Sequence, residues 1–431
     1  MSHKTRDLTV EGLSRVEGEG AMHVVLTEGE VADIKLRIYE PPRFFESFLR
    51  GRAFTEPPDI TARICGICPV AYQMSSCQAM EQVCGVTVDP PIRALRRLLY
   101  CGEWIESHVL HVYFLHAPDF LGVGSALELA ADHRDLVERA LTLKKIGNDI
   151  MEVVGGRPIH PVNVRLGGFY RTPTKRELRP LGEKLRWARD AALETVRLVA
   201  TFDFPDLEID HELVALHHPD EYAITEGRIV SDGGLNIEVA EFLEHVTEEH
   251  VPYSTTKHSH MLKRGRFLVG PLARYALNYD QLPALAREAA VEAGLGRVCR
   301  NPFRSIVVRA VETVAAIEDA IAIIDGYVEP ERPAVPVEPR AGTGHGATEA
   351  PRGLLYHRYT IDAQGSILEA DIIPPTAQNQ DAIETDLRSL VAANIHLDDH
   401  DLQHLCEQSI RNYDPCISCS THFLDFTVER R

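Results

Sequence analysis

The chain has 431 residues, 44 % of them hydrophobic, and a formal net charge of −19. This length and composition support a large buried core, and length alone would allow two or three domains. The negative charge argues against binding to a nucleic-acid backbone and favours a well-solvated surface.

The predicted elements begin with a β-hairpin over residues 21–38, where apolar and polar residues alternate on both sides of EGE. A helix is expected over 92–115, which has helical periodicity. Segment 323–346, rich in proline and then glycine, predicts a connection, and 354–373 predicts a second pair of strands. Further helices are expected over 127–153, 176–201, 281–294, 305–327, 381–395 and 400–411.

These elements indicate a mixed, helix-dominated α+β fold. We expect one domain over residues 1–431, because residues that belong together lie on both sides of the proline-rich connection. The sequence has no apolar run of about 18 residues that would span a membrane. Its first residues, MSHKTRDLTVEG, contain no apolar signal region. We therefore expect a cytoplasmic protein, unless a partner subunit carries an export signal.

Nine cysteines are scattered along the chain, an odd number that argues against a disulfide framework. Five of them are interpreted as ordinary buried residues. The other four form two C-x-x-C pairs near opposite ends: Cys65 and Cys68 in RICGIC, and Cys416 and Cys419 in DPCISCSTH.

Such pairs are typical of a metal site or a redox dithiol, and thiolates favour nickel, iron, zinc or copper(I). The loop between Cys68 and Cys416 spans most of the chain. Closing it costs roughly 2.5 kcal/mol more than closing the short loop of a zinc ribbon. Structural zinc supplies about 10–16 kcal/mol, so loop length does not exclude it. A site assembled from both ends needs the whole fold first, which suits a catalytic centre, and a redox dithiol explains only one pair. Spacing alone leaves all three open.

The flanking residues resemble the large subunit of nickel–iron hydrogenases. Besides the two cysteine motifs, the resemblance rests on SRVEGEG, PRFFESFLRGR, HVYFLHAPDF, EAPRGLLYH and IIPPTAQN, which occur in the family's order across nearly the whole chain. CGICPVAYQ is most similar to the cytoplasmic, NAD(P)-coupled branch that includes sulfhydrogenases. The resemblance implies a central helical bundle with small peripheral sheets, and an oxidoreductase that reversibly splits H2 into protons and electrons.

The resemblance also implies the ligands. Cys65 and Cys416 would be terminal nickel ligands, and Cys68 and Cys419 would bridge nickel to an iron that carries cyanide and carbon monoxide. Hydrogen is a very weak acid, so its heterolytic splitting needs a Lewis-acidic metal and an adjacent base. The sulfur of Cys416 would take the proton, since a metal-bound thiolate is already deprotonated.

Glu17, in SRVEGEG, would pass the proton onward from Cys416, by resemblance. A carboxylate is a competent proton relay. The alternative is a helix capping box, because Ser14-x-x-Glu17 fits its pattern. However, GEG and a strand pattern follow, rather than a helix.

Three further roles follow from the resemblance. Arg352 would lie over the open metal position, and Asp119 would orient it; the alternative is a buried structural ion pair. Pro351 would pack against the diatomic ligands. Thr376 would donate to a cyanide, against the alternative of a local backbone hydrogen bond.

A second, redox-inert ion, magnesium, would be bound by Glu46 and His422 with a backbone carbonyl near Ile372. By spacing alone, His422 could instead bind zinc or lie on the surface. For the three histidines that lie on or just after the helix predicted over 92–115, we expect packing and hydrogen bonding. They are His108, His111 and His116.

The sequence departs from the family pattern at two places. Many members have a histidine four residues after Cys68, where this chain has Tyr72, which cannot become cationic. The residues after His422, FLDFTVERR (423–431), resemble an extension that a maturation protease removes once nickel-insertion factors have acted. The alternative is that this tail is retained.

Electrons must leave through partners. No second set of cysteines has iron–sulfur spacing, and no G-x-G-x-x-G follows a strand. We expect an iron–sulfur small subunit, and diaphorase subunits that bind flavin and NAD(P). Alternative acceptors are a deazaflavin, a viologen-type carrier or sulfur/polysulfide. Two non-catalytic alternatives are a zinc-stabilised scaffold and a subunit like the hydrogenase-derived quinone-site subunit of respiratory complex I, which has lost the cysteine pairs.

Overall fold

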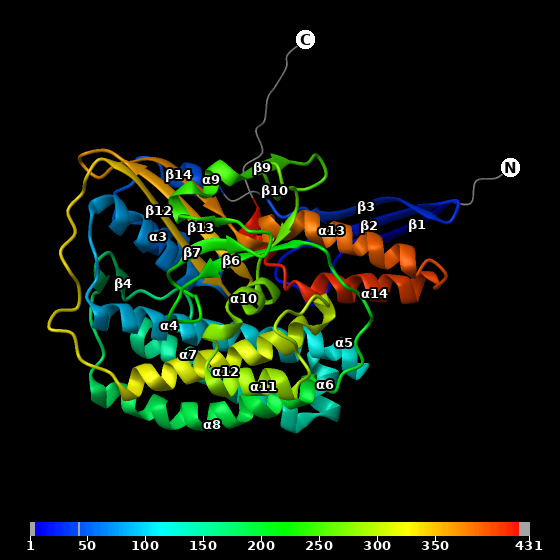
Figure 1. Ribbon diagram of the computed structural model, residues 1–431, viewed down its shortest axis with the longest axis horizontal. Coiled ribbons are helices and arrows are strands. Elements are labelled where there is room, and N and C mark those ends of the chain that lie inside the picture. Colours follow the sequence, from blue (N-terminus) through cyan, green and yellow to red (C-terminus); the bar gives the residue numbers. More distant parts are fainter. Residues whose placement is uncertain (1–4, 42–43, 422–431) are drawn as a thin grey trace, which may run out of the picture.

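The structure is a computed structural model, and it describes residues 5–41 and 44–421. Four long helices form a bundle that occupies the lower layer of Figure 1: α4 (Pro90–Leu110), α7 (Arg134–Gly155), α8 (Lys175–Val199) and α12 (Ser305–Asp325). In this bundle α4 packs against α7 and α12, and α8 packs against the same two helices.

Two glycines let α4 and α7 approach closely. A Cβ atom added at Gly102 would lie 2.9 Å from the carbonyl oxygen of Gly147, and one at Gly147 would lie 2.7 Å from that of Gly102. At the start of α8, the Thr174 side chain accepts the Glu177 amide while Glu177 accepts the Thr174 amide, which is a complete capping box.

The described residues also form small sheets, mostly antiparallel, above and beside the bundle (Figure 1). The predicted hairpin is confirmed as β2 (Gly20–Thr27) and β3 (Glu30–Ile38), with β1 (Thr5–Val10) added at its edge. Three other sheets of the described residues have two to four strands: β4 (Val164–Arg165) and β5 (Gly168–Phe169); β9 (Val246–His250) and β10 (Lys257–Met261); and β6 (Glu212–His217), β7 (Arg228–Ser231), β8 (Asn236–Ile237) and β11 (Phe267–Leu268).

The sheet of β12 (Gly342–Ala350), β13 (Gly353–Ile361) and β14 (Ile367–Ile373) contains the predicted second strand pair. The prediction of a connection up to residue 346 is wrong at its end, because β12 begins at Gly342. Helix α3 (Pro69–Cys84) lies directly on this strand. A Cβ atom at Gly344 would meet the carbonyl oxygen of Ala79 at 2.0 Å. The glycine is therefore there for close packing.

The helix predicted over 92–115 is confirmed, but its last part is a π-helix, His111–His116. The helix predicted over 127–153 is interrupted at His133, between α6 (Ala126–Asp132) and α7. Two other predicted helices correspond to α11 (Ala284–Glu292) and α14 (Asp399–Asn412), and α13 (Pro375–Ala393) starts earlier than predicted. The remaining short helices are α1 (Phe45–Leu49), α2 (Pro57–Thr61), α5 (Ala117–Leu121), α9 (Phe242–His245), α10 (Pro271–Leu277) and α15 (Ile417–Ser420), with 3₁₀ turns at Val239–Glu241, Tyr279–Gln281 and Pro302–Arg304.

The larger buried apolar cluster takes residues from Leu8 to Cys419, on both sides of the proline-rich segment 323–346. A smaller cluster lies around β6, β7 and the facing side of β13. The helix-dominated α+β class with a bundle and small sheets is confirmed. Within the described ranges, no helix is both long and apolar enough to cross a membrane.

Candidate metal centre

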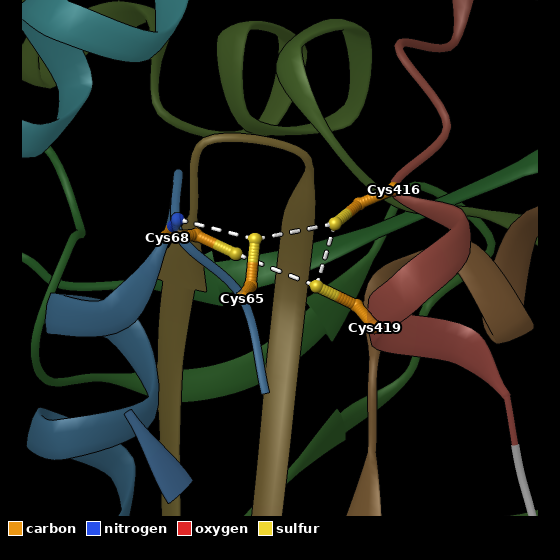
Figure 2. A group of neighbouring side chains, drawn as sticks. All are labelled: Cys65, Cys68, Cys416 and Cys419. Carbon is orange, nitrogen blue, oxygen red and sulfur yellow. Dashed lines mark hydrogen bonds between the residues drawn. The ribbon is translucent and has the colours of Figure 1, made fainter. Parts of the chain in front are cut away.

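The four cysteines of the two C-x-x-C pairs meet in one cluster, with their sulfurs directed toward one another (Figure 2). All four sulfur atoms lie within 4.8 Å of one another. The Sγ atoms of Cys65 and Cys416 are 3.4 Å apart, and those of Cys68 and Cys419 are 3.6 Å apart. Each cysteine is buried, with at most 6 % of its surface exposed.

The first pair is held at the start of α3. Cys68 is the N-cap of this helix and is followed by Pro69, a residue suited to a first helical turn. The sulfur of Cys65 accepts the amide of Cys68 at 3.4 Å. Glu103 of α4 accepts the amides of Val70 at 2.6 Å and Ala71 at 3.1 Å, which satisfies free donors of the first turn. Sequence reasoning missed Glu103, because only the fold places it at this helix end.

The second pair is held at α15, the last helix of the described chain: Cys416 is its N-cap and Cys419 lies within it. The amide of Cys416 donates to the Thr376 hydroxyl at 3.0 Å, and that of Ile417 donates to the Glu17 carbonyl at 3.0 Å. Thr376 therefore accepts from the backbone of the second cysteine pair, 40 residues away, rather than from its own neighbouring backbone as the alternative expected, and its hydroxyl hydrogen stays available for donation. A cyanide acceptor for that hydrogen stays a prediction.

Glu17 contacts the predicted proton source. The thiol of Cys416 donates to Glu17 Oε2 at 3.2 Å, and the same oxygen accepts the Ser418 amide at 3.0 Å. Glu17 is half-buried. No helix starts at Ser14, so the capping-box alternative is excluded. The geometry is that of a carboxylate placed to exchange a proton with a thiol.

Arg352 and Pro351 form the tight turn between β12 and β13, since Ala350 pairs with Gly353. Arg352 donates from Nε to the carbonyl of Asp414 at 2.8 Å and from Nη2 to its Oδ1 at 3.2 Å. Its Nη1 is buried without a hydrogen-bond partner. Asp414 itself has a left-handed backbone, with φ of 50°.

The predicted pairing of Arg352 with Asp119 is wrong. Asp119 lies on α5, and its oxygens accept from Arg411 Nε at 2.7 Å, from Arg411 Nη2 at 2.8 Å and from Arg15. Two arginines thus occupy this fully buried carboxylate. Asp414, two residues before Cys416, takes the place predicted for Asp119; the sequence signal for it was its position in DPCISC.

The electrostatics of the cluster favour a cation. Hydrogen bonding from Cys416 lowers the pKa of Cys65, whereas burial raises the pKa of Cys416. Burial opposes the charge of Arg352, but Asp414 and the thiols raise its pKa above the ordinary value. Buried thiolates need compensating positive charge, and one arginine cannot balance four of them. The donor set and the free Nη1 therefore fit soft metal ions with small ligands beside Arg352.

The predicted magnesium ligands are brought together in part. Glu46 Oε1 accepts the Ile372 amide at 2.8 Å, which places the carboxylate beside the predicted backbone carbonyl. His422 lies outside the described residues, as does the 423–431 tail. The magnesium site and the removal of the tail stay predictions.

Tyr72 is buried beside the cluster. Its ring centroid lies 5.6 Å from that of His357, and its buried hydroxyl faces the thiol of Cys419. Burial and then the charge of Cys419 raise its pKa, so it remains a neutral hydrogen-bond donor.

The other thiols and histidines are packed groups. Four of the five remaining cysteines are buried and Cys84 is half-buried. Burial raises the pKa of Cys77 and of Cys406 to about 12, so both stay protonated. Burial lowers the pKa of each histidine on or after α4: His108, His111 and His116.

Comparisons with known proteins agree on one family. A family model described as "Nickel-dependent hydrogenase" matches residues 43–148 and 245–422. The chain is 36 % identical over 422 residues to sulfhydrogenase 1 subunit alpha of Pyrococcus furiosus, covering 96 % of this chain and 97 % of that protein. It is 28 % identical to NAD-reducing hydrogenase HoxS subunit beta of Cupriavidus necator, covering 97 % and 95 %. The fold superposes on a chain of an NAD+-reducing [NiFe]-hydrogenase in the H2-reduced state with a TM-score of 0.88, at 26 % identity and with coverage of 97 % and 99 %.

Proposed function

Because the chain belongs to the nickel-dependent hydrogenase family as a catalytic large subunit acting on H2, we propose that it delivers electrons through an iron–sulfur partner subunit to NAD(P). The observation that carries the catalytic part is the buried cluster of four thiols from both ends of the chain. Family membership implies nickel and iron at this cluster.

We assign Cys65 and Cys416 as terminal nickel ligands, and Cys68 and Cys419 as ligands shared with iron. Each sulfur of the first pair lies within 3.6 Å of a sulfur of the second, as sharing requires. When bound, the two metals supply the Lewis acidity that splits H2 heterolytically. Thr376 accepts the amide of Cys416, and Pro351 directly precedes Arg352; both would contact the small ligands of iron.

The protein's own residues then handle charge and protons. Cys416 accepts the proton, and Glu17 receives it across 3.2 Å, a distance suited to transfer. Arg352 cannot act as an ordinary acid because its charge is fixed. Its free Nη1 places a positive charge and hydrogen-bond donors beside the reacting centre.

The exit for electrons is proposed at the loop between the first two cysteines. Gly66 is exposed between buried Cys65 and Cys68. A Cβ atom at Gly66 would lie 4.0 Å from the side chain of Ile159. Val162 follows three residues later, and the amide of Tyr170 donates to the carbonyl of the adjoining Asn163. Ile159, Val162 and Tyr170 are 55 %, 46 % and 64 % exposed. An apolar surface so close to the thiols supports docking of an iron–sulfur subunit there.

The described residues offer no second thiol cluster that could carry electrons away, which supports the need for partner subunits. Among the described residues, the four cysteines are the one cluster of thiols close enough to share a metal, and the other candidate group, Asp398 with His400 and Asp401, is exposed. The names of the relatives describe subunits of larger hydrogenases. Flavin and NAD(P) would then lie on further subunits, and magnesium would lie at Glu46.

The acceptor is tested with the complex purified from its native host, supplied with H2 and with NAD+, NADP+, a deazaflavin or polysulfide in turn. We expect reduction of NAD+ or NADP+ at rates that exceed the others. Reduction of a deazaflavin or of polysulfide alone would reject the NAD(P) assignment. Cys65→Ser should abolish every rate, while Cys84→Ser, which changes a thiol outside the cluster, should leave them unchanged.

A further inference from the structure

A fully buried arginine of α10, Arg274, contacts the backbone immediately before Arg352. Its Nη1 donates to the carbonyl of Ala350 at 2.7 Å, and its Nη2 donates to the carbonyl of Pro351 at 2.8 Å. These two residues lead into the turn that carries the Arg352 guanidinium. The fork geometry of a guanidinium suits such a pair of acceptors.

The same guanidinium is anchored by two carboxylates. Nε and Nη2 donate to the two oxygens of Glu312 on α12, both at 2.9 Å, and Nη1 donates to Glu349 on β12 at 3.2 Å. These three bonds and the two to backbone carbonyls engage all five N–H donors of an arginine. The Trp104 ring lies 4.4 Å below the guanidinium.

The carboxylates are fixed in turn. Tyr222 donates to Glu312 at 2.7 Å, and His108 lies 3.0 Å from its other oxygen. Glu349 accepts the Leu216 amide at 2.8 Å. Burial alone would raise the pKa of Glu312, but the charge of Arg274 lowers it to about 2, so this pair is charged.

The backbone around the turn also leaves little space for movement. Gly270 precedes α10 with φ of 113°, and a Cβ atom there would lie 2.8 Å from the Arg352 carbonyl oxygen. Gly353 follows Arg352 with φ of 137°, and a Cβ atom there would lie 2.8 Å from the Gly270 amide nitrogen. The start of α10 therefore lies directly against the turn formed by Pro351 and Arg352, which we call the arginine turn.

We propose that Arg274, anchored by Glu312 and Glu349, is a positioning residue that fixes the arginine turn and so aims Arg352 at the thiol cluster. A buried ion pair is a weak source of stability compared with well-packed apolar residues. The five directed hydrogen bonds of Arg274 instead fix the geometry of the turn that carries Arg352. The importance of that geometry for turnover rests on the proposed function, whereas the rigidity of the turn does not.

The test compares Arg274→Lys with Arg96→Lys in the full chain and its complex. Arg96 is a matched control: it is a buried arginine that binds both oxygens of Glu81, at 2.6 and 2.8 Å, and the carbonyl of Arg165. It does not contact the arginine turn. Lysine keeps the charge and loses the fork in both variants.

We expect amide hydrogen exchange in residues 350–356 to accelerate in Arg274→Lys and not in Arg96→Lys. The turnover number for H2 should fall about 100-fold in Arg274→Lys, since a small misplacement of a reacting group has that scale of effect. The nickel content and the KM for H2 should match those of Arg96→Lys. Equal exchange and equal turnover in the two variants would overturn the proposal.

A second pair of variants, Glu349→Gln and Glu81→Gln, keeps the proposal testable if Arg274→Lys does not fold. Glu349→Gln keeps an oxygen for Arg274 and should lower turnover about tenfold, whereas Glu81→Gln should not; equal turnover would again overturn the positioning role. If hydrogen exchange separates the variants but the unaltered complex neither binds nickel nor turns over H2, the proposed function fails while the positioning of the turn stands.

Discussion

The two cysteine pairs reach the same cluster from supports of different kinds. Cys65 and Cys68 stand at the start of a 16-residue helix, α3, whose first amides are satisfied by the buried Glu103. Cys416 and Cys419 stand on a single short turn near the end of the described chain. That turn is held by side chains from distant elements, among them Glu17 and Thr376.

The supports of the two cysteine pairs differ in purpose: those of the first pair stabilise the fold, and those of the second pair also take part in the chemistry. The support of the first pair consists of helix, backbone amides and core, and any residue that satisfied the amides would serve it. The contacts of the second pair involve a carboxylate on the thiol and a guanidinium beside it, which are also the groups that the reaction needs. Changes near the first pair should therefore act on folding, and changes near the second should act on turnover.

The largest effect is expected at Glu17. Glu17→Gln keeps the shape and removes the proton acceptor, so H2 turnover should fall about 10²- to 10⁴-fold, the usual contribution of a general base. Nickel content should stay unchanged. Glu19→Gln, the same change at an exposed residue two positions on, is the control. Full activity in Glu17→Gln would show that the proton leaves by another route.

The next effect distinguishes two aspartates. Asp414→Asn keeps an oxygen for Arg352 but removes the charge, and asparagine tolerates the left-handed backbone. Turnover should fall about tenfold, as expected for a loosened positioning contact. Asp119→Asn should leave turnover per nickel intact and lower the free energy of unfolding by about 3–5 kcal/mol, because it removes the buried negative charge that balances two arginines. The reverse pattern would restore Asp119 as the residue that orients Arg352.

A change at Glu103 probes the first pair. Both of its oxygens accept backbone amides, so the NH2 group of Glu103→Gln would face one of these donors. We expect denaturant unfolding to show a loss of about 1–3 kcal/mol, with turnover per bound nickel unchanged. Glu128→Gln, where an exposed carboxylate accepts the Gly124 amide, should change stability by less than about 0.5 kcal/mol. A loss of turnover without a loss of stability would contradict the comparison.

The smallest effect at neutral pH concerns His357, which lies against Tyr72 of α3. Burial lowers its pKa to about 3, below about 6.5 in an unfolded chain. The folded state therefore favours the neutral ring, and this contribution is complete above pH 6.5 and is lost as the pH falls toward 3, at about 1.4 kcal/mol per pH unit. The stability difference between the unaltered chain and His357→Gln should shrink accordingly between pH 7 and pH 5 in denaturant unfolding. His400→Gln, at an exposed histidine, is the control, and parallel pH curves for the unaltered chain and His357→Gln would contradict the prediction.

The sequence predicted the elements that have a clear period or breaker. The hairpin of β2 and β3 and the helices α4, α8 and α12 follow from such patterns. Helix α3 was not predicted, because it is buried almost all round and has no polar face to give a period. The glycines at the start of β12 resembled a loop, although they are there because α3 lies against the strand.

The residues of the candidate site likewise divide into those that a local sequence motif identifies and those that only the fold identifies. The four cysteines, Glu17 and Arg352 were found because each belongs to a short motif. Asp414 was passed over in favour of Asp119, since a sequence does not show which of two carboxylates meets a given arginine. Glu103 and Arg274 act through contacts with backbone far along the chain. Such contacts leave no local pattern, so only the fold could reveal them.

The central claim is that four thiols from the two ends of the chain hold nickel and iron together. It is tested most directly by the nickel, iron and zinc content of the chain purified from its native host. The account predicts about one nickel and one iron per chain, as a site with shared thiolates requires. Zinc in their place, without nickel, would contradict it and would leave a zinc-stabilised scaffold built on a hydrogenase fold.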